Sequence, residues 1–519
     1  MPESTDLEPL LLNALSPALG VIATLGDAFA AAGHELYLVG GSVRDALLGE
    51  LGHDLDFTTD ARPEQTVAVL RPLVSAIWEV GKDFGTISAL VHSPDAAADH
   101  PGWQVEITTF RSDAYSPDSR KPTVKYGEHI GEDLIRRDFT VNAMAIDVTG
   151  ADPKGWRFVD PLNGLADLEA RLLRTPTAPE ISFSDDPLRM MRAARFASQL
   201  GFELEPTTAA ALPQMAERID IISAERVRDE LTKLLLTDQP RAGLNILVDS
   251  QIADHVLPEL PAMRLETDEH MRHKDVYEHS LTVLDQAIEL EKSRDLIDGK
   301  PNPDHQPDLI IRLAALLHDI GKPRTRALDG GKVTFHHHDV VGAKMAKKRL
   351  RALRYSNEIV DAVSQLIEQH LRFHGYAEGS SGGASSGWTD SAVRRYVRDA
   401  GDQLERLHIL TRSDCTTRNQ RKADRLRRAY DELEFRIDEL AAQEELDAMR
   451  PDLNGDQIIE MLGVKPGPIV GKAYKFLLDR RMDEGPLGEE RARAELLEWW
   501  AGQGENPTNQ HGQDDEQAK

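Results

Sequence analysis

The spacing of apolar residues divides the chain into two parts. Before residue 150, a helical run of Leu, Ala and Ile over 10–32 ends at Gly33. Short apolar or alternating runs follow it and predict β-strands. These runs cover residues 35–41, 53–59, 86–92, 104–110 and 144–148. Strands mixed with a few helices predict an α/β or α+β head.

Beyond residue 165 the apolar residues recur at helical spacing almost throughout. Examples are the segments 186–202, 224–236 and 309–321. Two polar loops, 291–308 and 378–387, interrupt this half, and the Gly/Ser-rich composition of the second predicts flexibility. The last residues, 503–519, contain almost no apolar side chain, so we expect them to be disordered.

Length and composition add limits to this picture. A chain of 519 residues is expected to form about three or four domains. The single cysteine, Cys415, excludes a disulfide framework and any CxxC metal site. No apolar run approaches the roughly 18 residues of a membrane-spanning helix, so we expect no membrane partner. The acidic N-terminus lacks the basic start of a secretory signal, and we therefore expect a cytoplasmic protein.

The formal charge is −27, from 61 basic and 88 acidic residues, and by itself it argues against a nucleic-acid partner. Two local stretches oppose that view. Residues 341–354 carry six basic side chains and no acid, and residues 389–430 carry eleven basic and six acidic ones. Basic helical stretches bind phosphates by releasing counterions, although each stretch alone is equally explained as a solvated helix face.

A pair of glycines lies between a predicted strand and a predicted helix. In LVGGSVRDALLG (38–49), Gly40, Gly41 and Ser42 form the junction, and Arg44 follows one turn into the helix. Glycines let the backbone approach a ligand closely, and the start of a helix offers free N–H groups to a phosphate. Such turns are common without a ligand, so this feature alone is also explained as a structural turn.

Two acids follow about ten residues later, in HDLDFTTD (53–60). Residues two apart in a strand point to the same face, so Asp54 and Asp56 present their carboxylates together. Like charges this close favour a cation between them, and carboxylates together with phosphates suit Mg²⁺. Glu106, on a neighbouring predicted strand, is a third candidate. Solvated acids on an edge strand are the structural alternative.

The glycine turn followed by DLD resembles the signature of the polymerase-β-type nucleotidyltransferases. More closely, it resembles the class II CCA tRNA nucleotidyltransferase/poly(A) polymerase family. Later motifs of that family occur in order over about 190 residues, and together they are far more specific than any one alone. They are EDLIRRDFTVNAMAID (132–147), FVDPLNGLADLEARLLR (158–174), FSDDPLRMMRAARF (183–196) and SAERVRDEL (223–231).

The resemblance implies an α+β fold: a polymerase-β-like nucleotidyltransferase head with a mixed sheet, followed by a mostly α-helical neck, body and HD domain. It implies catalysis by Asp54, Asp56 and Glu106, with Mg²⁺ held by the two aspartates. It implies tRNA, CTP and ATP as partners. The implied contacts to the triphosphate and ribose come from Gly40, Gly41, Ser42, Arg44, Arg136, Arg137, Asp138 and Asn142.

The third of these later motifs is the one that selects the nucleobase in the family. Here it places Asp186, Arg189, Arg192 and Arg195 at a spacing of three along a predicted helix. A carboxylate accepts hydrogen bonds and a guanidinium donates them, so such a pair can imitate a partner base. The family motif begins Glu-Asp, whereas this chain has Asp185-Asp186. A solvated helix with alternating charges would explain the segment in isolation.

The helical half contains histidines and aspartates in an order that resembles the HD-domain phosphohydrolases. Imidazole and carboxylate together bind divalent cations. The resemblance implies a divalent metal of unknown identity bound by His279, His318, Asp319 and Asp414, with His338 and His370 as additional ligands. Single histidines usually have capping or surface roles. A phosphohydrolase acting on phosphomonoesters or 2′,3′-cyclic phosphates, or a vestigial site that shapes the tRNA-binding body, are both consistent with the pattern.

We therefore expect a CCA-adding tRNA nucleotidyltransferase, with further HD phosphohydrolase activity as an open extension. A polar loop within 110–134 resembles the loop that lets CCA-adding enzymes change from C to A addition. A poly(A) polymerase or a partial CC- or A-adding enzyme shares every motif. An HD phosphohydrolase with an RNA-binding head is disfavoured by the intact Asp54 and Asp56. The oligomeric state stays open, and the expected domains are 1–165 (head), 166–265 (neck), 266–430 (HD domain), 431–502 (helical tail) and 503–519.

Overall fold

The computed structural model describes residues 11–503 except 80, 83–84, 93–101, 112–125, 151, 266–274, 298, 331, 374–387, 417–418 and 445–449. The chain forms two compact units. The first comprises Met1–Glu266 with Lys348–Ser356, and the second comprises Thr267–Lys347 with Asn357–Lys519. The predicted flexible loop 378–387, most of the loop in 110–134 and the expected disordered tail lie outside the described residues. No helix among the described residues is long and apolar enough to cross a membrane.

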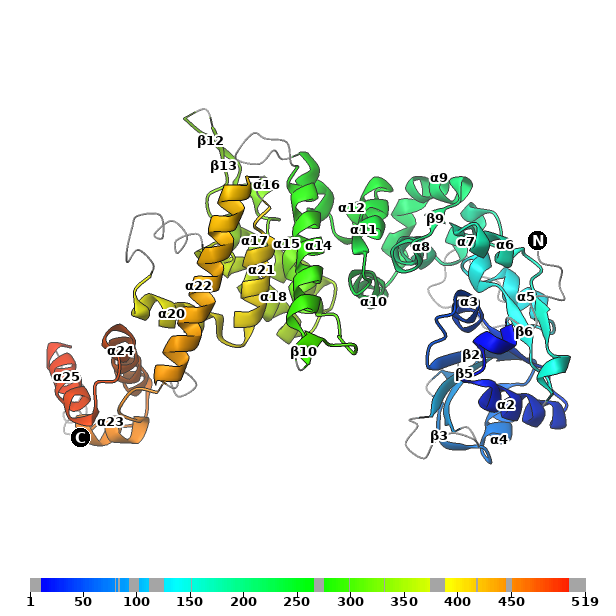
Figure 1. Cartoon of the computed structure of the whole chain (residues 1–519), viewed down its shortest axis with the longest axis horizontal. Coiled ribbons are helices and arrows are strands. Elements are labelled where there is room, and N and C mark those ends of the chain that lie inside the picture. Colours follow the sequence, from blue (N-terminus) through cyan, green and yellow to red (C-terminus); the bar gives the residue numbers. More distant parts are fainter. Residues whose placement is uncertain are drawn as a thin grey trace, which may run out of the picture. The chain divides into compact units, whose positions relative to one another are not determined.

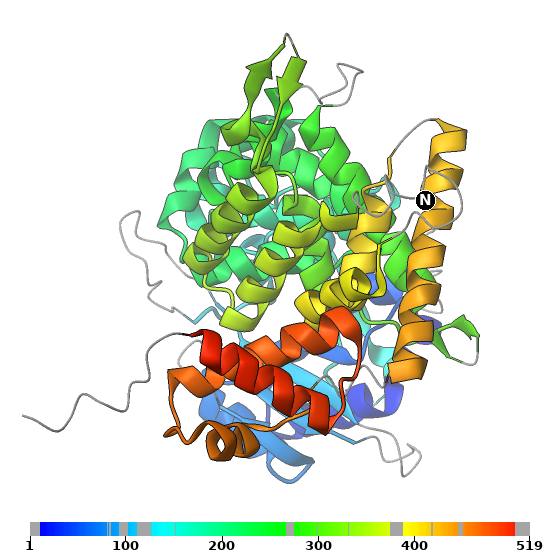
Figure 2. The same cartoon turned by 90° about the vertical axis from the view of Figure 1, so that its left-hand side faces the viewer.

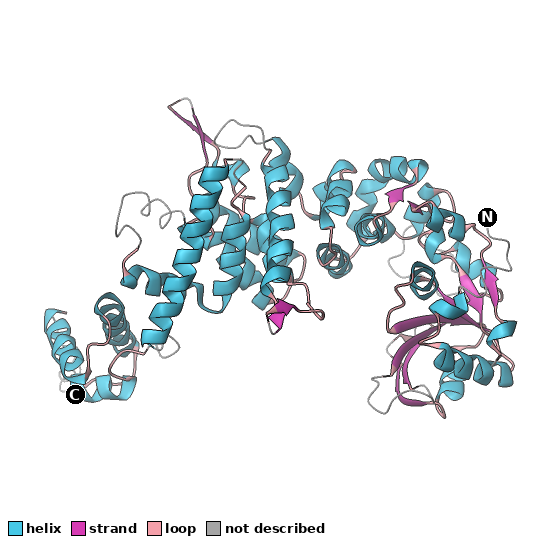
Figure 3. Ribbon diagram, in the orientation of Figure 1, coloured by secondary structure: helices cyan, strands magenta, loops and turns pink. Residues whose placement is uncertain are grey.

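A seven-stranded sheet organises the start of the first unit, in the order β3-β4-β5-β2-β1-β6-β7. Strands β2 and β5 pair in parallel, and the other neighbours pair antiparallel. The sheet is therefore mixed, and the predicted α+β class is confirmed (Figure 3). The strands are β1 (Leu36–Val39), β2 (Asp54–Thr59), β3 (Val74–Trp78), β4 (Thr86–Val91), β5 (Trp103–Thr109), β6 (Ala145–Asp147) and β7 (Arg157–Val159).

All five predicted strands are present, within about two residues of their expected bounds. The sequence missed β3 and β7, which form the two edges of the sheet. Edge strands are covered on fewer sides, so their apolar pattern is weaker. The predicted helix 10–32 is also interrupted, because residues 15–18 form a turn before α2 (Leu19–Ala31). Pro17 lies in that turn and cannot donate a helical hydrogen bond.

One face of the sheet is covered by α2 and α4 (Pro63–Leu70), which lie side by side in Figure 1. Buried strand residues such as Leu55, Phe57 and Val105 join residues of α2 in a single apolar core. Since side chains alternate along a strand, the residues between them face the other way. That opposite face carries Asp54, Asp56 and Glu106, all exposed.

The remainder of the first unit is helical, as predicted. Helices α8, α10 and α11 pack on one another, and short helices surround them. The bounds are α3 (Gly41–Leu48), α5 (Ile130–Ile135), α6 (Gly164–Glu169), α7 (Pro179–Asp185), α8 (Leu188–Leu200), α9 (Pro206–Met215), α10 (Ala224–Leu235), α11 (Pro240–Asp249), α12 (Ile252–Val256) and α13 (Glu259–Ala262).

The second unit is centred on a helical bundle in which α14, α15, α18 and α21 pack against one another (Figure 1). A buried apolar stretch of α15, including Leu313, Leu316 and Leu317, lies within it. The bounds are α14 (Val276–Arg294), α15 (Leu309–Leu317), α16 (Lys322–Thr325), α17 (His338–Ala352), α18 (Asn357–Gln369), α20 (Asp390–Ala400), α21 (Leu404–Ser413) and α22 (Gln420–Glu444).

Three last helices, α23 (Gly455–Leu462), α24 (Pro468–Glu484) and α25 (Glu489–Gly502), form a small group in red and orange in Figure 2. They have their own apolar core around Ile458, Leu477 and Leu496. The predicted boundary at residue 165 falls within α6, and the one at residue 430 falls within α22. The finer division into head, neck, HD domain and tail stays a prediction.

Candidate functional site

Three carboxylates lie together on the open face of the sheet. Asp56 stands directly opposite Glu106 in the parallel β2–β5 pair, and Asp54 lies two residues before Asp56 on the same face. The Asp56 amide donates to Ser42 Oγ at 2.9 Å, which joins the strand to the glycine turn. Desolvation by neighbouring residues raises the pKa of Asp56, and the charges of Glu106 and Asp54 add to this while Arg137 opposes it. Clustered carboxylates of this kind suit a hard divalent cation.

The glycine turn precedes α3 and requires its first glycine. Gly40 has φ +68°, which favours glycine, and a Cβ there would lie 2.8 Å from Arg137 Nη1. Arg44, predicted to contact phosphate, is buried and pairs with Asp45 at 2.7 Å. It also donates to Asn142 Oδ1 at 2.6 Å. Through these two contacts Arg44 stabilises the turn from the protein interior. Its contact with phosphate stays a prediction.

Asp138 is the centre of a buried network. It accepts hydrogen bonds from Asn142 Nδ2 at 3.0 Å and from Arg192 Nε at 2.7 Å. Burial alone would raise its pKa, but Arg192 and the hydrogen bond from Asn142 hold the pKa of Asp138 well below its usual range. The predicted ribose motif, which also contains Arg136 and Arg137, is thus tied to helix α8.

Two further predicted arginines share an acidic partner that the sequence interpretation did not single out. Arg195 Nε lies 2.7 Å from Glu230 Oε2, and Arg192 Nη1 lies 3.7 Å from Glu230 Oε1. Glu230 is a buried residue of α10. It belongs to the SAERVRDEL motif, so the motif itself was the signal, but one sequence does not show which arginine its acid would meet.

Asp186 lies outside the helix on which the sequence placed it. Helix α8 begins at Leu188, and Asp186 has extended backbone between α7 and α8. Its Oδ1 accepts from the Leu188 amide at 3.1 Å, because the first amides of a helix lack helical partners. Its Oδ2 lies 2.7 Å from Nη2 of Arg226 on α10, a second residue that the sequence interpretation missed.

Arg189, the expected partner of Asp186 in base selection, is buried in the first turn of α8. Its Nη1 donates to Ser182 Oγ at 2.9 Å, and its Nη2 donates to the Arg136 carbonyl. Asp185 lies nearby: burial raises its pKa, and the charges of Arg189 and Arg136 oppose that rise. The guanidinium of Arg189 is therefore held in place by α7 and by the arginine motif.

A second cluster forms where the helices of the second unit meet. His279 lies on α14, and the other five predicted ligands lie at the ends of α15, α17, α18 and α21. His279 Nε2 lies 2.9 Å from Asp414 Oδ1. Asp319 lies 3.2 Å from His318 Nε2 and 3.4 Å from His338 Nε2. His336 and His337, the neighbours of His338, are exposed instead.

The four histidines are held in one orientation. The Nδ1 atoms of His318, His338 and His370 lie 2.6–2.8 Å from the backbone carbonyls three residues earlier. His279 Nδ1 lies 3.2 Å from Thr416 Oγ1. Metal-binding histidines are commonly held through the ring nitrogen that does not bind the metal. This arrangement leaves every Nε2 available to a cation.

The donor atoms form two groups, each with atoms within 4.8 Å of one another: His279, His318 and Asp414, and Asp319, His338 and His370. Burial lowers the pKa of His370 to about 4, and the charge of His318 adds to this. His338 Nε2 is buried and has no hydrogen-bond partner in the described part of the chain. A neutral imidazole and an unsatisfied buried nitrogen fit a metal-binding site. Lys322, which the sequence interpretation did not single out, lies 2.8 Å from Asp319 Oδ2.

Three family models match successive parts of the chain. The model of the "Poly A polymerase head domain" matches residues 36–174. The model described as "Probable RNA and SrmB- binding site of polymerase A" matches residues 201–263. The "HD domain" model matches residues 276–419. The first match contains the carboxylates and the glycine turn, and the last contains the histidine cluster.

Individual relatives extend the comparison to nearly the whole chain. An A-adding tRNA nucleotidyltransferase from Deinococcus radiodurans is 33% identical over 476 residues, which are 89% of this chain and 95% of the relative. A CCA-adding enzyme from Lactobacillus helveticus is 40% identical over 240 residues, which are 46% of this chain and 54% of the relative. That second match therefore spans about half the length of the CCA-adding relative.

Solved structures share the fold. The CCA-adding enzyme of Bacillus stearothermophilus in complex with CTP has a TM-score of 0.60 at 25% identity, covering 94% of this chain and 98% of that one. The Thermotoga maritima CCA-adding enzyme complexed with tRNA has a TM-score of 0.56 at 20% identity and covers 95% of this chain and 98% of that one. With its poly(A) polymerase-type head, its HD domain and a full-length relative at 33% identity, this chain belongs to the tRNA nucleotidyltransferase family.

Proposed function

We propose that the protein adds C, C and A to the 3′ ends of tRNA, using CTP and ATP and releasing pyrophosphate. The observation that carries the proposal is the carboxylate face of the sheet. Asp54, Asp56 and Glu106 lie on adjacent strands beside a glycine turn that opens a helix. A cation and a triphosphate can meet at such a place, because the acids attract the cation and the turn exposes backbone amides.

The three carboxylates and the residues next to them have separate tasks in this reaction. Asp54 and Asp56 would hold Mg²⁺, and the ion would supply activation of the 3′-hydroxyl and neutralisation of charge on the triphosphate and the leaving pyrophosphate. Glu106 raises the negative charge next to Asp56 and so favours cation binding. Ser42 fixes the backbone of β2 through the Asp56 amide. Arg137, which lies beside Gly40, offers a guanidinium to the phosphates.

Base selection is assigned to Asp186 and Arg189. Cytosine and adenine both carry an amino donor on the edge where guanine and uracil carry a carbonyl oxygen. A carboxylate accepts from that amino group and repels the carbonyl oxygen, while the guanidinium donates to the adjoining ring nitrogen. Because Arg226 and the start of α8 orient Asp186, and Ser182 orients Arg189, the pair is held in a fixed arrangement before a nucleotide binds.

A second candidate function within the family is addition of A alone. The Deinococcus radiodurans relative, an A-adding tRNA nucleotidyltransferase, matches over 95% of its length. The test uses three tRNAs that end before CCA, after C and after CC, each with CTP and ATP. An enzyme of the proposed type completes all three, whereas an A-adding enzyme extends only the last. An unlimited A tail would identify a poly(A) polymerase.

For the second cluster we propose a metal-dependent phosphohydrolase acting on phosphomonoesters or 2′,3′-cyclic phosphates. Six imidazole and carboxylate side chains, each able to offer one atom to a metal ion, lie in two groups of three. Imidazole nitrogen favours transition-metal cations over Mg²⁺. When bound, the metal supplies an activated water and polarises the phosphate. Lys322, beside Asp319, offers its ammonium group to a phosphate oxygen.

The domain division and the cytoplasmic location are proposals of the same kind. The head would span 1–165, the neck 166–265, the HD domain 266–430 and the helical tail 431–502. A cytoplasmic location is supported by the single cysteine of the sequence, which rules out a framework of internal disulfides. It also fits substrates that are nucleotides and tRNA.

A further inference from the structure

Helix α22 carries its charges in the order that a helix dipole disfavours. Residues 421–428 contain five basic side chains and one acid, whereas residues 431–442 contain five acids and one base. The amino end of a helix is the positive end of its dipole, so acids stabilise it and cations destabilise it. The first turn of α22 contains no acid and the last turn no base. Helix stability therefore does not explain this charge order.

Helix α17, which holds the other basic stretch, follows the opposite and favourable order. Asp339 lies in its first turn, and Arg349 and Arg351 lie in its last turn. Arg349 also pairs with Glu259 Oε2 at 2.8 Å. The dipole and these local partners explain the charges of α17 without a ligand. The same explanation fails for α22.

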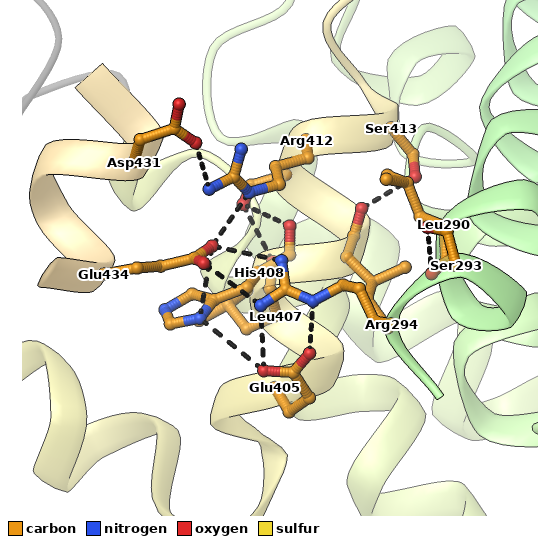
Figure 4. A network of polar contacts seen from close by, with 12 residues as sticks. Leu290, Ser293, Arg294, Glu405, Leu407, His408, Arg412, Ser413, Asp431 and Glu434 are labelled. Atoms are coloured by element: carbon orange, nitrogen blue, oxygen red, sulfur yellow. Dashed lines mark hydrogen bonds and ion pairs between the residues drawn. The ribbon is translucent and has the colours of Figure 1, made fainter. Parts of the chain in front are cut away.

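The acidic end of α22 has a structural use. Figure 4 shows Glu434 between Arg294 of α14 and Arg412 of α21, with Asp431 beside the same Arg412. Arg412 Nε lies 2.8 Å from Glu434 Oε1, and its Nη2 lies 2.9 Å from Asp431 Oδ1. Arg294 Nη2 lies 3.1 Å from Glu434 Oε2. These ion pairs fasten the second half of α22 to the bundle.

The basic end of α22 has no comparable partners. Arg421, Lys422 and Arg425 are exposed, and their side chains meet no acid among the described residues. Arg427 lies 3.6 Å from Asp424, the one acid of this segment. By contrast, arginines earlier in the basic stretch 389–430 form ion pairs with acids of the same chain. Arg395 pairs with Asp483, Arg406 with Asp308 and Arg412 with Glu434.

The position of this surplus charge in the chain connects it with the HD cluster. Asp414, a predicted metal ligand, ends α21, and Thr416 contacts His279. The first turn of α22 begins only four residues after Thr416. Arg421, Arg425 and Arg428 follow at i, i+4 and i+7, so they share one side of the helix over about 10 Å. Guanidinium groups on one side of a helix match a row of phosphates.

We propose that the basic surface formed by residues 421–428 binds the phosphate backbone of tRNA beside the HD cluster. The inference rests on the proposed function for the identity of the RNA. The charge argument requires only a polyanion that compensates the unfavourable helix end. When lysine and arginine side chains neutralise bound phosphates, condensed counterions are released, and this release favours binding. It offsets the stability that the helix loses because it carries cations at its amino end. Such a conflict between local stability and sequence is expected at functional surfaces.

The test uses the full-length protein with Arg421→Gln, Lys422→Gln and Arg425→Gln combined. Binding of a labelled tRNA is measured by fluorescence anisotropy over a range of salt concentrations. We expect about tenfold weaker binding at low salt, and a slope of log affinity against log salt that is smaller by about 2. The midpoint of thermal unfolding is expected to stay the same or rise, because cations have been removed from the positive end of the helix.

Two further variants distinguish the contribution of this surface from the effect of net charge on tRNA binding. Lys344→Gln, Lys348→Gln and Arg351→Gln on α17 change the net charge by the same amount. We expect them to keep the salt slope and to lower the unfolding midpoint. Arg421→Lys with Arg425→Lys retains the charge and should retain the slope.

Wild-type slope in the α22 triple variant, or equal losses of affinity in both triple variants, would overturn the proposal. So would displacement of tRNA by an acidic protein but not by polyphosphate, since that would identify a protein partner. If wild-type protein binds tRNA through this surface but adds no nucleotide, the proposed function fails while the docking surface stands.

Discussion

Arg192 Nε lies 2.7 Å from Asp138 Oδ2, and this ion pair between a buried carboxylate and a partly exposed guanidinium joins the arginine motif after the sheet to helix α8. The other oxygen of Asp138 accepts from Asn142, and Asn142 in turn accepts from Arg44 beneath the glycine turn. A single hydrogen-bonded chain therefore connects the glycine turn with helix α8, which also carries Arg189. Because Asp138 and Arg44 are buried, removing one residue of the chain leaves a buried polar group without its partner.

We predict that Asp138→Asn destabilises the first unit by about 1.5–3 kcal/mol, because it removes a charge-assisted hydrogen bond between a buried carboxylate and a partly exposed guanidinium. Chemical denaturation measures this loss. Arg157→Ala, which breaks the exposed pair with Asp147, is the control and should cost below about 1 kcal/mol. Equal losses in the two variants would contradict the role of Asp138.

The same ion pair predicts a pH dependence. The pKa of Asp138 is lowered in the folded protein, so its contribution to stability is complete above the ordinary carboxyl pKa of about 4. As the pH falls below that value, the unfolded state takes up the proton first and the contribution is lost. The free energy of unfolding of the wild type should therefore fall more steeply below about pH 4 than that of Asp138→Asn. Parallel curves would count against the ion pair.

The carboxylate face gives the second prediction. Asp56→Asn should reduce kcat for nucleotide addition by at least about a thousandfold, because it removes a carboxylate that we propose holds the catalytic cation. Asp56 is exposed and lies among like charges, so its replacement should leave the unfolding midpoint unchanged or slightly higher. Asp60→Asn, just beyond the same strand, is the matched control with near wild-type kcat. Steady-state kinetics with CTP that gave equal kcat for both variants would exclude Asp56 from catalysis.

Arg226 gives the third prediction, because it lies 2.7 Å from Asp186. Without it the carboxylate loses one of the two contacts that orient it. We expect Arg226→Ala to reduce the preference for CTP over UTP, measured as a ratio of kcat/KM, by about tenfold, which is within the 1–3 kcal/mol of a good base contact. Lys233→Ala, an exposed change on the same helix, should leave the ratio unaltered. Asp186→Ala should abolish the preference, and an unchanged ratio in that variant would refute the assignment.

Local periodicity was sufficient to predict the side of the sheet on which the acids lie. Asp54 and Asp56 are two residues apart in a strand, and buried Leu55 and Phe57 alternate with them. The side of the sheet on which Glu106 lies follows from the same alternation. Its position opposite Asp56, however, depends on a parallel strand pairing that no local pattern specifies. Likewise, the order of the histidine motifs predicted a cluster, whereas the division into two donor groups required the packing of the bundle.

Partners across long stretches of chain were not predictable. The sequence placed Arg44 at a phosphate, while the fold surrounds it with Asp45 and Asn142. It also placed Asp186 on helix α8, which begins two residues later, at Leu188. Pro187 fits both the first turn of a helix and the position before it, so the sequence did not distinguish the two. Glu230 and Arg226 lie 35 and 40 residues from the side chains they hold. Such contacts depend on how helices pack, which the spacing of residues within one helix does not determine.

The HD cluster gives the fourth prediction. His318→Ala with Asp319→Ala removes one ligand from each donor group and should abolish stoichiometric metal binding, measured by elemental analysis of the purified protein. Phosphatase activity should disappear with the metal, while nucleotide addition stays within about twofold of the wild type. The exposed pair His336→Ala with His337→Ala is the control and should retain the metal. A full metal complement in the first variant would show that the cluster is not the metal site.

Addition of three defined nucleotides is tested by extension of a tRNA that ends before CCA. Purified protein is incubated with that tRNA, CTP, ATP and Mg²⁺, and the products are resolved at single-nucleotide length. We expect growth by three residues, with no growth when CTP is omitted. Extension only of a tRNA that already ends in CC, or an A tail without a fixed length, would contradict it.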